Sequence, residues 1–170
     1  MNAIVWGATP QEHARSYPAD VLVPGGLRLT RAIDVAAPSE VTWRWLCQLA
    51  VAPYSYDWID NLGRRSPQDL TPGAERLEVG QRMAIVFRLT SYDEGRQWTG
   101  LARARGVGRC SLTYAAEPVG EASRIVVRMV LEEGGRVGWA RARAIAWGDL
   151  VMMRRQLLNL RDLSQRRATI

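Results

Sequence analysis

The chain contains no lysine, a single histidine and only two cysteines among its 170 residues. Cys47 and Cys110 cannot make a disulfide framework, and neither has the spacing of a zinc-binding CxxC or Cys/His cluster. His13 lies in a polar N-terminal segment, so a histidine-based triad would require this segment to fold back. The GxGxxG, P-loop, GxSxG and HExxH motifs are absent as well. We therefore expect no metal site and no cofactor.

Long apolar runs are also missing. No stretch approaches the ~18 to 20 uncharged apolar residues that cross a bilayer, and the first residues lack the basic and apolar regions of a signal peptide. We therefore expect a cytoplasmic protein without a transmembrane segment. Because 47% of the residues are apolar, intrinsic disorder is excluded. The length favours one domain over residues 1–170, with an N-terminal arm at 1–26.

Without lysine, all 23 basic residues are arginine, and they are unevenly distributed. Residues 1–135 carry 15 arginines and 15 acidic residues, so this part is electrically balanced. Residues 136–170 carry eight arginines against Asp149 and Asp162, and the whole net charge of +6 lies there. A neutral body with a basic end does not favour nucleic acid as the partner.

Hydrophobic periodicity predicts the order of the elements. Residues 27–35 alternate with period two, which indicates a strand. Residues 38–50 begin with Pro-Ser-Glu and carry apolar residues at helical spacing, and a second short helix is expected from near Ser55 to Gly63. After a polar loop over 64–81, alternation indicates four further strands, at 83–89, 98–104, 110–116 and 125–131.

The last predicted element is a long helix over 139–165. Its apolar residues recur at spacings of three and four, namely Ala146, Leu150, Met153, Leu157 and Leu160. The whole pattern predicts an α+β fold in which a curved antiparallel sheet wraps around this helix, with two short helices after the first strand. A sheet face covered by one long helix leaves space between them, so we expect a ligand cavity there.

Three segments resemble a known superfamily. RLTRAIDVAAPSEVTWRWLCQL at 28–49, YSYDWIDNLG at 54–63 and DLVMMRRQLLNLRDLSQR at 149–166 are similar to the START-like, or SRPBCC, proteins, and to an actinobacterial subgroup largely without assigned function. The resemblance implies the helix-grip fold. Members of the superfamily bind lipids, sterols, polyketides or hormones in the cavity, and a minority are cyclases, aromatases or hydrolase-like enzymes. Fold alone does not choose among these activities.

The YSYDW segment concentrates polar and aromatic residues, Tyr54, Tyr56, Asp57 and Trp58. The resemblance implies that this segment closes one end of the cavity. The phenols and the carboxylate are suited to orient a polar end of a ligand, and Asp57 is a candidate general base. Equally, Asp57 is suited to cap the second short helix while the aromatics pack beneath it.

Arg31 interrupts the apolar face of the first predicted strand, and a buried guanidinium requires a partner. It is a candidate anchor for a carboxylate or phenolate of the ligand. The alternatives are that Arg31 pairs with an internal Asp or Glu, or that it lies at the wet end of the strand.

Large apolar side chains of the strands and the long helix are candidates for the cavity wall, although a closed core uses the same residue types. These candidates are Met83, Phe87, Trp98, Leu101, Tyr114, Met129, Leu150 and Met153.

The basic face of the long helix also has two interpretations. Arg143, Arg154 and Arg161 fall on one line of the helix, and Trp147 and Val151 lie beside it. Such a face is either solvated or a contact site for an anionic membrane surface, nucleic acid or a partner. The sequence is compatible with a monomer or a homodimer.

Two functional hypotheses follow. The first is a binding protein that holds a small hydrophobic ligand, similar to a lipid, polyketide or aromatic molecule, between the sheet and the long helix. The second is a cyclase or aromatase without a cofactor, acting in the same cavity through Tyr56, Asp57 and Arg31.

Overall fold

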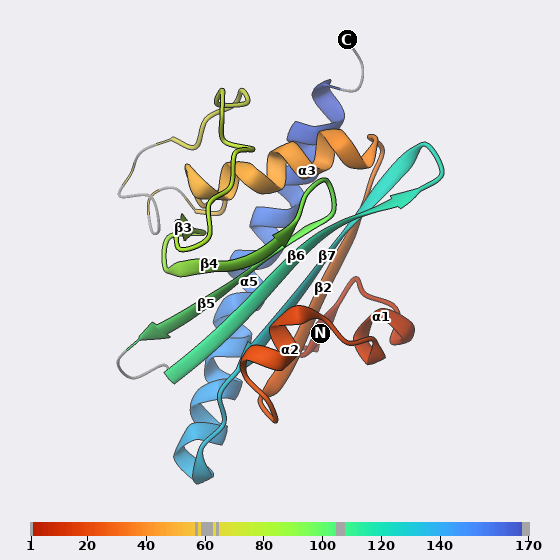
Figure 1. The fold of residues 1–170 in the computed structure, drawn as a ribbon. Helices are drawn as coiled ribbons and strands as arrows, with labels where there is room; N and C mark the ends of the chain where they lie inside the picture. Colours follow the sequence, from red (N-terminus) through yellow and green to blue (C-terminus); the bar gives the residue numbers. More distant parts are fainter. Residues whose placement is uncertain (1, 57, 59–62, 64, 105–107, 168–170) are drawn as a thin grey trace.

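The computed structural model describes residues 2–56, 58, 63, 65–104 and 108–167. Within these residues one twisted sheet has the strand order β1-β2-β7-β6-β5-β4-β3, and all neighbours except β1 and β2 are antiparallel (Figure 1). The strands are β1 Val5–Trp6, β2 Leu27–Val35, β3 Arg82–Met83, β4 Phe87–Asp93, β5 Gln97–Ala104, β6 Gly108–Val119 and β7 Ala122–Leu131.

The long helix α5, Gly135–Arg167, lies along one face of this sheet (Figure 1). Its predicted apolar stripe is buried, from Ala146 at 0% exposure to Leu160 at 0%. This arrangement confirms the α+β fold predicted from the sequence. Among the described residues no helix has both the length and the apolarity needed to cross a bilayer.

A shorter helix covers the end of the same face. Helix α3, Ser39–Cys47, continues into a 3₁₀ turn at Gln48–Ala50, as the Pro-Ser-Glu start and the apolar spacing predicted. The indole Nε1 of Trp98 in β5 donates a hydrogen bond to the Leu46 carbonyl of α3, over 3.1 Å. The predicted second short helix near Ser55 falls mostly outside the described residues.

The sheet register determines which side chains face α5. One row of residues runs across five strands as Leu29, Met129, Leu112, Gly100 and Leu89. The next inward row contains Arg31, Val127, Tyr114 and Trp98. Because side chains alternate between the two faces, the residues between these rows point away from α5.

The N-terminal segment, predicted as an arm, covers that opposite face. Helices α1, Pro10–Ala14, and α2, Pro18–Leu22, lie over the strands there (Figure 1). Arg128 of β7 is fully buried beneath them and donates hydrogen bonds to the carbonyls of Glu12, His13 and Arg15 at 3.2, 2.7 and 2.9 Å. His13 bonds through Nδ1 to Thr30 Oγ1 over 2.8 Å. This segment is therefore a docked layer held by polar contacts.

The prediction of one continuous strand over 83–89 is wrong, because the chain forms two short paired strands there. Met83 and Phe87 are partners across a tight hairpin, so the chain reverses between β3 and β4. Ala84 and Ile85 adopt φ values of 40° and 71°, and the Ala84 amide donates to the Leu49 carbonyl over 2.7 Å. The alternating pattern remained regular across the reversal because the hairpin returns Met83 and Phe87 to the same face.

The parallel pairing of β1 depends on a close backbone approach at Gly7. A Cβ at this position would lie 2.0 Å from the Ala32 carbonyl oxygen, and Gly7 has a φ of +71°. Gly25 has a similar φ of +73° but nothing within 4 Å. We expect Gly7→Ala to lower the free energy of unfolding by at least about 2 kcal/mol more than Gly25→Ala, because only the first substitution adds a clash to the backbone strain. Urea denaturation of both variants measures the difference, and equal losses would contradict this packing.

Candidate functional site

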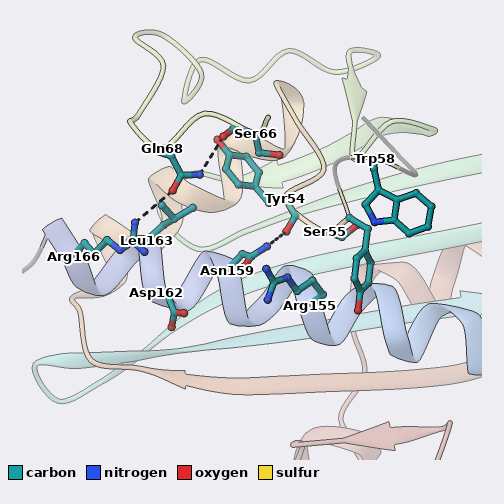
Figure 2. Close-up of a pocket in the computed structure, with 11 residues that line it drawn as sticks. Tyr54, Ser55, Trp58, Ser66, Gln68, Arg155, Asn159, Asp162, Leu163 and Arg166 are labelled. Atoms are coloured by element: carbon teal, nitrogen blue, oxygen red, sulfur yellow. Dashed lines mark hydrogen bonds between the residues drawn. The ribbon is translucent and has the colours of Figure 1, made fainter. Parts of the chain in front are cut away.

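Two hollows adjoin α5, and we call them the inner cavity and the outer groove. The inner cavity, of about 130 Å³, lies between α5 and the inward face of the sheet. The outer groove, of about 550 Å³, lies between residues 54–56, 58, 66 and 68 and the C-terminal half of α5 (Figure 2). Ser55 borders both of them. The cavity lining is Pro53, Ser55, Ala84, Ile85, Phe87, Leu112, Tyr114, Met129, Asp149, Met152, Met153 and Gln156.

The lining follows from the periods of the elements that supply it. Leu112 and Tyr114 are alternate residues of β6, and Met129 is the register partner of Leu112 on β7. The α5 residues Asp149, Met152, Met153 and Gln156 are spaced by three and four, so they share one helix face. A sheet face of period two and a helix face of period 3.6 thus form two walls of the cavity.

A buried ion pair lies at one side of the inner cavity. Arg31 is 1% exposed, and its Nη2 donates to Asp149 Oδ2 over 3.1 Å. The same guanidinium donates to the carbonyls of Ala3 and Ile4, at 2.7 and 2.9 Å. The structure thus matches the alternative that Arg31 pairs with an internal acid. Arg31 does not line the cavity, so its expected role as a ligand anchor is not supported.

Burial dominates the ionisation of this pair. It raises the pKa of Asp149 to about 6, although the Arg31 charge and hydrogen bond act in the opposite direction. Burial likewise lowers the pKa of Arg31, against the attraction of Asp149. The Asp149 charge also affects the pKa values of two neighbouring groups. Burial and then the Asp149 charge raise the pKa of Tyr114 well above its ordinary value and that of Cys110 to about 12.

A chain of hydrogen bonds separates the inner cavity from the outer groove. The Tyr114 hydroxyl donates to Gln156 Oε1, and Gln156 Nε2 donates to the Pro53 carbonyl over 2.6 Å. One turn further along α5, Asn159 Nδ2 donates to the Tyr54 carbonyl over 2.8 Å (Figure 2). These contacts fasten the 53–54 segment to α5.

The rim of the inner cavity carries unusual backbone geometry. Within the described residues, the non-glycine positions with positive φ are Tyr54, Ala84 and Ile85, at 55°, 40° and 71°. Ala84 and Ile85 line the cavity, and Tyr54 lies between the lining residues Pro53 and Ser55. A β-branched residue in this region is a true outlier, and such strain costs about 1 to 3 kcal/mol at each position.

The outer groove has a polar lining. Arg155 and Arg166 line it together with Asp162, and Arg166 Nη1 donates to Gln68 Oε1 over 3.4 Å (Figure 2). The Trp58 side chain at its border is 76% exposed. Tyr56 also lines this groove. The lining of the groove is therefore more polar than that of the inner cavity.

The residues predicted to bind ligand divide among four places. Phe87, Tyr114, Met129 and Met153 line the inner cavity. Tyr54, Tyr56 and Trp58 line the outer groove instead. Met83, Trp98 and Leu150 lie in the closed core, where the Trp98 ring stacks on Tyr114 at 4.8 Å between centroids. The prediction for Leu101 is corrected: it packs against Ala19, Val23 and Val130 on the opposite face of the sheet.

The predicted catalytic set does not meet in one place. Arg31 lies in the core beside Asp149, whereas Tyr56 lies in the outer groove. Asp57 is outside the described residues. Asp149 and Gln156 were not among the predicted site residues, although both are polar residues on the buried face of a predicted amphipathic helix. Their polar side chains, among the apolar residues of that face, were the sequence feature that could have indicated a site there.

The basic outer face of α5 is partly paired. Arg143 contacts Glu133 at 2.6 Å and stacks over the Trp139 ring. Trp147 and Val151 are exposed, at 53% and 56%. Peripheral membrane contact through this face stays a prediction.

Known proteins resemble this chain in sequence pattern and in fold. Residues 27–165 match a family described as polyketide cyclase / dehydrase and lipid transport. The search among curated proteins gave no match.

Solved structures with this fold include a Mesorhizobium loti protein at 13% identity and a TM-score of 0.56, with 82% of this chain and 97% of that chain covered. A Thermobifida fusca protein has 13% identity and a TM-score of 0.54, with 80% and 94% covered. The di-domain ARO/CYC protein BexL from the BE-7585A biosynthetic pathway has 12% identity and a TM-score of 0.51, with 79% and 45% covered. At these identities the likeness shows the fold alone, and the helix-grip prediction is confirmed.

The raised pKa of Asp149 predicts a pH dependence of stability. The folded chain keeps the proton up to about pH 6, whereas an unfolded chain releases it near pH ~3.9. The unfolded state is therefore deprotonated first as the pH rises, and stability falls between pH ~4 and ~7. Relative to Asp149→Asn, the wild-type free energy of unfolding should decrease by about 2 kcal/mol over this range.

Urea denaturation at several pH values tests this expectation. Asp162→Asn, at an exposed position of the same helix, is the matched control and should show no such trend relative to wild type. A wild-type stability that rises relative to Asp149→Asn with pH would show that Asp149 is stabilised as the anion.

Proposed function

The chain belongs to the polyketide cyclase / dehydrase and lipid transport family, and on that premise we propose that it binds a small apolar molecule in the inner cavity. The observation that carries this proposal is the unfilled space between α5 and the sheet. Its walls are mainly apolar side chains, with few polar groups among them. Ligand sites of proteins commonly have this composition, in which apolar walls supply affinity and a few polar groups supply orientation.

The inner cavity is open to solvent on the side of Ile85, which is 39% exposed, so its volume indicates the size of the ligand part that it can hold. A dry apolar cavity of ~150 Å³ binds benzene, and the inner cavity measures about 130 Å³. Sites for drug-sized ligands begin at ~300 Å³. The space therefore suits a molecule of one ring, or a short chain of similar size, better than a whole lipid or a multi-ring polyketide.

Methionine side chains favour the inner cavity as an adaptable site. Met129, Met152 and Met153 line it from the sheet and from α5. Methionine is unbranched and polarisable, so it adjusts to irregular apolar shapes and makes favourable contacts with aromatic rings. An aromatic ligand therefore agrees with these walls.

The outer groove supports binding of an apolar ligand less well. Its lining includes Arg155, Asp162 and Arg166, whose charges would lose hydration on contact with an apolar molecule. Desolvation of charged groups opposes such binding. The catalytic alternative based on Arg31 and Tyr56 is also less favoured, since these residues lie in separate places. We therefore favour binding in the inner cavity.

Toluene is a suitable first probe of this function. We expect saturable binding to the full chain, with the largest changes at the ¹³C-labelled methyl groups of Met129, Met152 and Met153, because these side chains line the cavity. Substitution of Met152 by Trp should fill part of the space and weaken toluene binding at least about tenfold, or about 1.4 kcal/mol.

The neighbouring Val151→Trp is the matched control. Val151 is 56% exposed on the other side of α5, so the same bulky side chain should leave toluene affinity unchanged there. NMR titration of the three proteins measures the affinities. The absence of methyl shifts in the wild type with toluene and also with phenol would overturn the proposed function.

A further inference from the structure

We propose that Asp149 is the group that recognises the ligand in the inner cavity, and that this ligand is a neutral one-ring or similarly small molecule donating a hydroxyl hydrogen bond, such as a phenol. This inference rests on the proposed function and gives its ligand a chemical class. It replaces the expectation that a guanidinium of the strand holds an acidic ligand.

Asp149 is the charged member of the cavity lining within the described part of the chain. Its side chain is 11% exposed, so it is largely removed from solvent. Oδ2 accepts the hydrogen bond from Arg31. Oδ1 accepts none from the described residues, yet it is not among the fully buried atoms without a partner. The second carboxylate oxygen thus keeps some accessible surface, and Asp149 is a lining residue of the cavity.

Three donors near Asp149 are directed elsewhere. The Tyr114 hydroxyl donates to Gln156 Oε1, and Gln156 Nε2 donates to the Pro53 carbonyl. The Cys110 thiol is directed at the Ser111 carbonyl, over 3.9 Å. A carboxylate oxygen in an apolar setting gains from a hydrogen-bond donor. A ligand hydroxyl within the cavity would provide one.

The ion pair also determines the charge that the site accepts. Arg31 balances Asp149, so together they carry no net charge. An anionic ligand would meet the carboxylate first, and a cationic ligand would compete with Arg31 for it. A neutral donor keeps the existing pair and completes the hydrogen bonds of Asp149. Arg31 accordingly acts as a positioning residue, holding Oδ2 so that Oδ1 remains available.

The size of the cavity and the Asp149 acceptor suggest three small ligands for a binding test. Toluene and phenol have nearly the same shape but differ in one donor, and anisole retains the oxygen without the donor. We expect the wild-type chain to bind phenol more tightly than toluene, although toluene is the more apolar molecule. We expect phenol to bind at least about tenfold more tightly than anisole, because a hydrogen bond to a charged acceptor is among the stronger ones.

The Asp149→Asn substitution tests the hydrogen bond to the ligand without changing the size of the side chain. Asparagine has the same shape, and its oxygen can accept the Arg31 hydrogen bond while its NH₂ group is presented to the cavity. The ratio of phenol to anisole affinity should then fall about tenfold relative to wild type, since the cavity now presents a donor. Asp162→Asn, the same change in the outer groove, should keep the wild-type ratio.

NMR titration measures these affinities. If Asp149→Asn does not fold, the ¹³C chemical shift of the Asp149 carboxyl group in the wild-type chain provides a second test. Phenol should move this signal, and toluene should not. Equal binding of phenol and anisole, or an unmoved carboxyl signal at saturating phenol, would overturn the role of Asp149. If toluene still binds, only this inference fails. If neither toluene nor phenol binds, the proposed function fails.

Discussion

The buried ion pair between Arg31 and Asp149 connects the parts of this fold. Arg31 joins β2 to the Ala3 and Ile4 carbonyls beside β1, and its bond to Asp149 joins both to α5. Burial opposes the charged form of each partner. Removal of one partner from such a pair typically costs about 3 to 5 kcal/mol, whereas apolar replacement of both is often tolerated. A pair of this kind thus adds little net stability. Its place beside the inner cavity therefore agrees better with a role in ligand recognition than with a role in stability.

The two faces of the sheet differ in polarity and in the elements that cover them. The outward face carries a polar row of Thr30, Arg128, Thr113 and Thr99, closed by the N-terminal segment through hydrogen bonds. The inward face carries large residues that are almost completely buried, such as Leu112, Val127 and Trp98. The outward layer is thus held by polar contacts, whereas the inward face carries the apolar core and borders the inner cavity. Strained positions at the rim, such as Ile85, lie on this inward side.

Local periodicity predicted most of the architecture, because strands and amphipathic helices obey simple spacing rules. The strand 27–35 and the buried stripe of α5 agree with the structure. The reversal between Met83 and Phe87 could not be seen, since a hairpin that preserves the face preserves the alternation. The partner of Arg31 was equally hidden. Asp149 is 118 residues away, and only the docking of α5 on β2 brings them together.

The candidate site was predicted less well than the fold, for a physical reason. The same apolar residue types fill a core and line a cavity, so Trp98 and Met129 looked alike in the sequence, although Trp98 is packed and Met129 borders the space. Leu101 was assigned against the strand alternation that places it on the opposite face. Polar interruptions of a buried helix face, as at Asp149, carry more specific information than the apolar residues around them.

Intermolecular nuclear Overhauser effects between bound phenol and the labelled chain test most directly whether a small neutral ligand occupies the inner cavity beside Asp149. We expect contacts from the phenol ring to the methyl groups of Met129, Met152 and Met153. Contacts to the Trp58 indole of the outer groove, without any to these methyl groups, would contradict it.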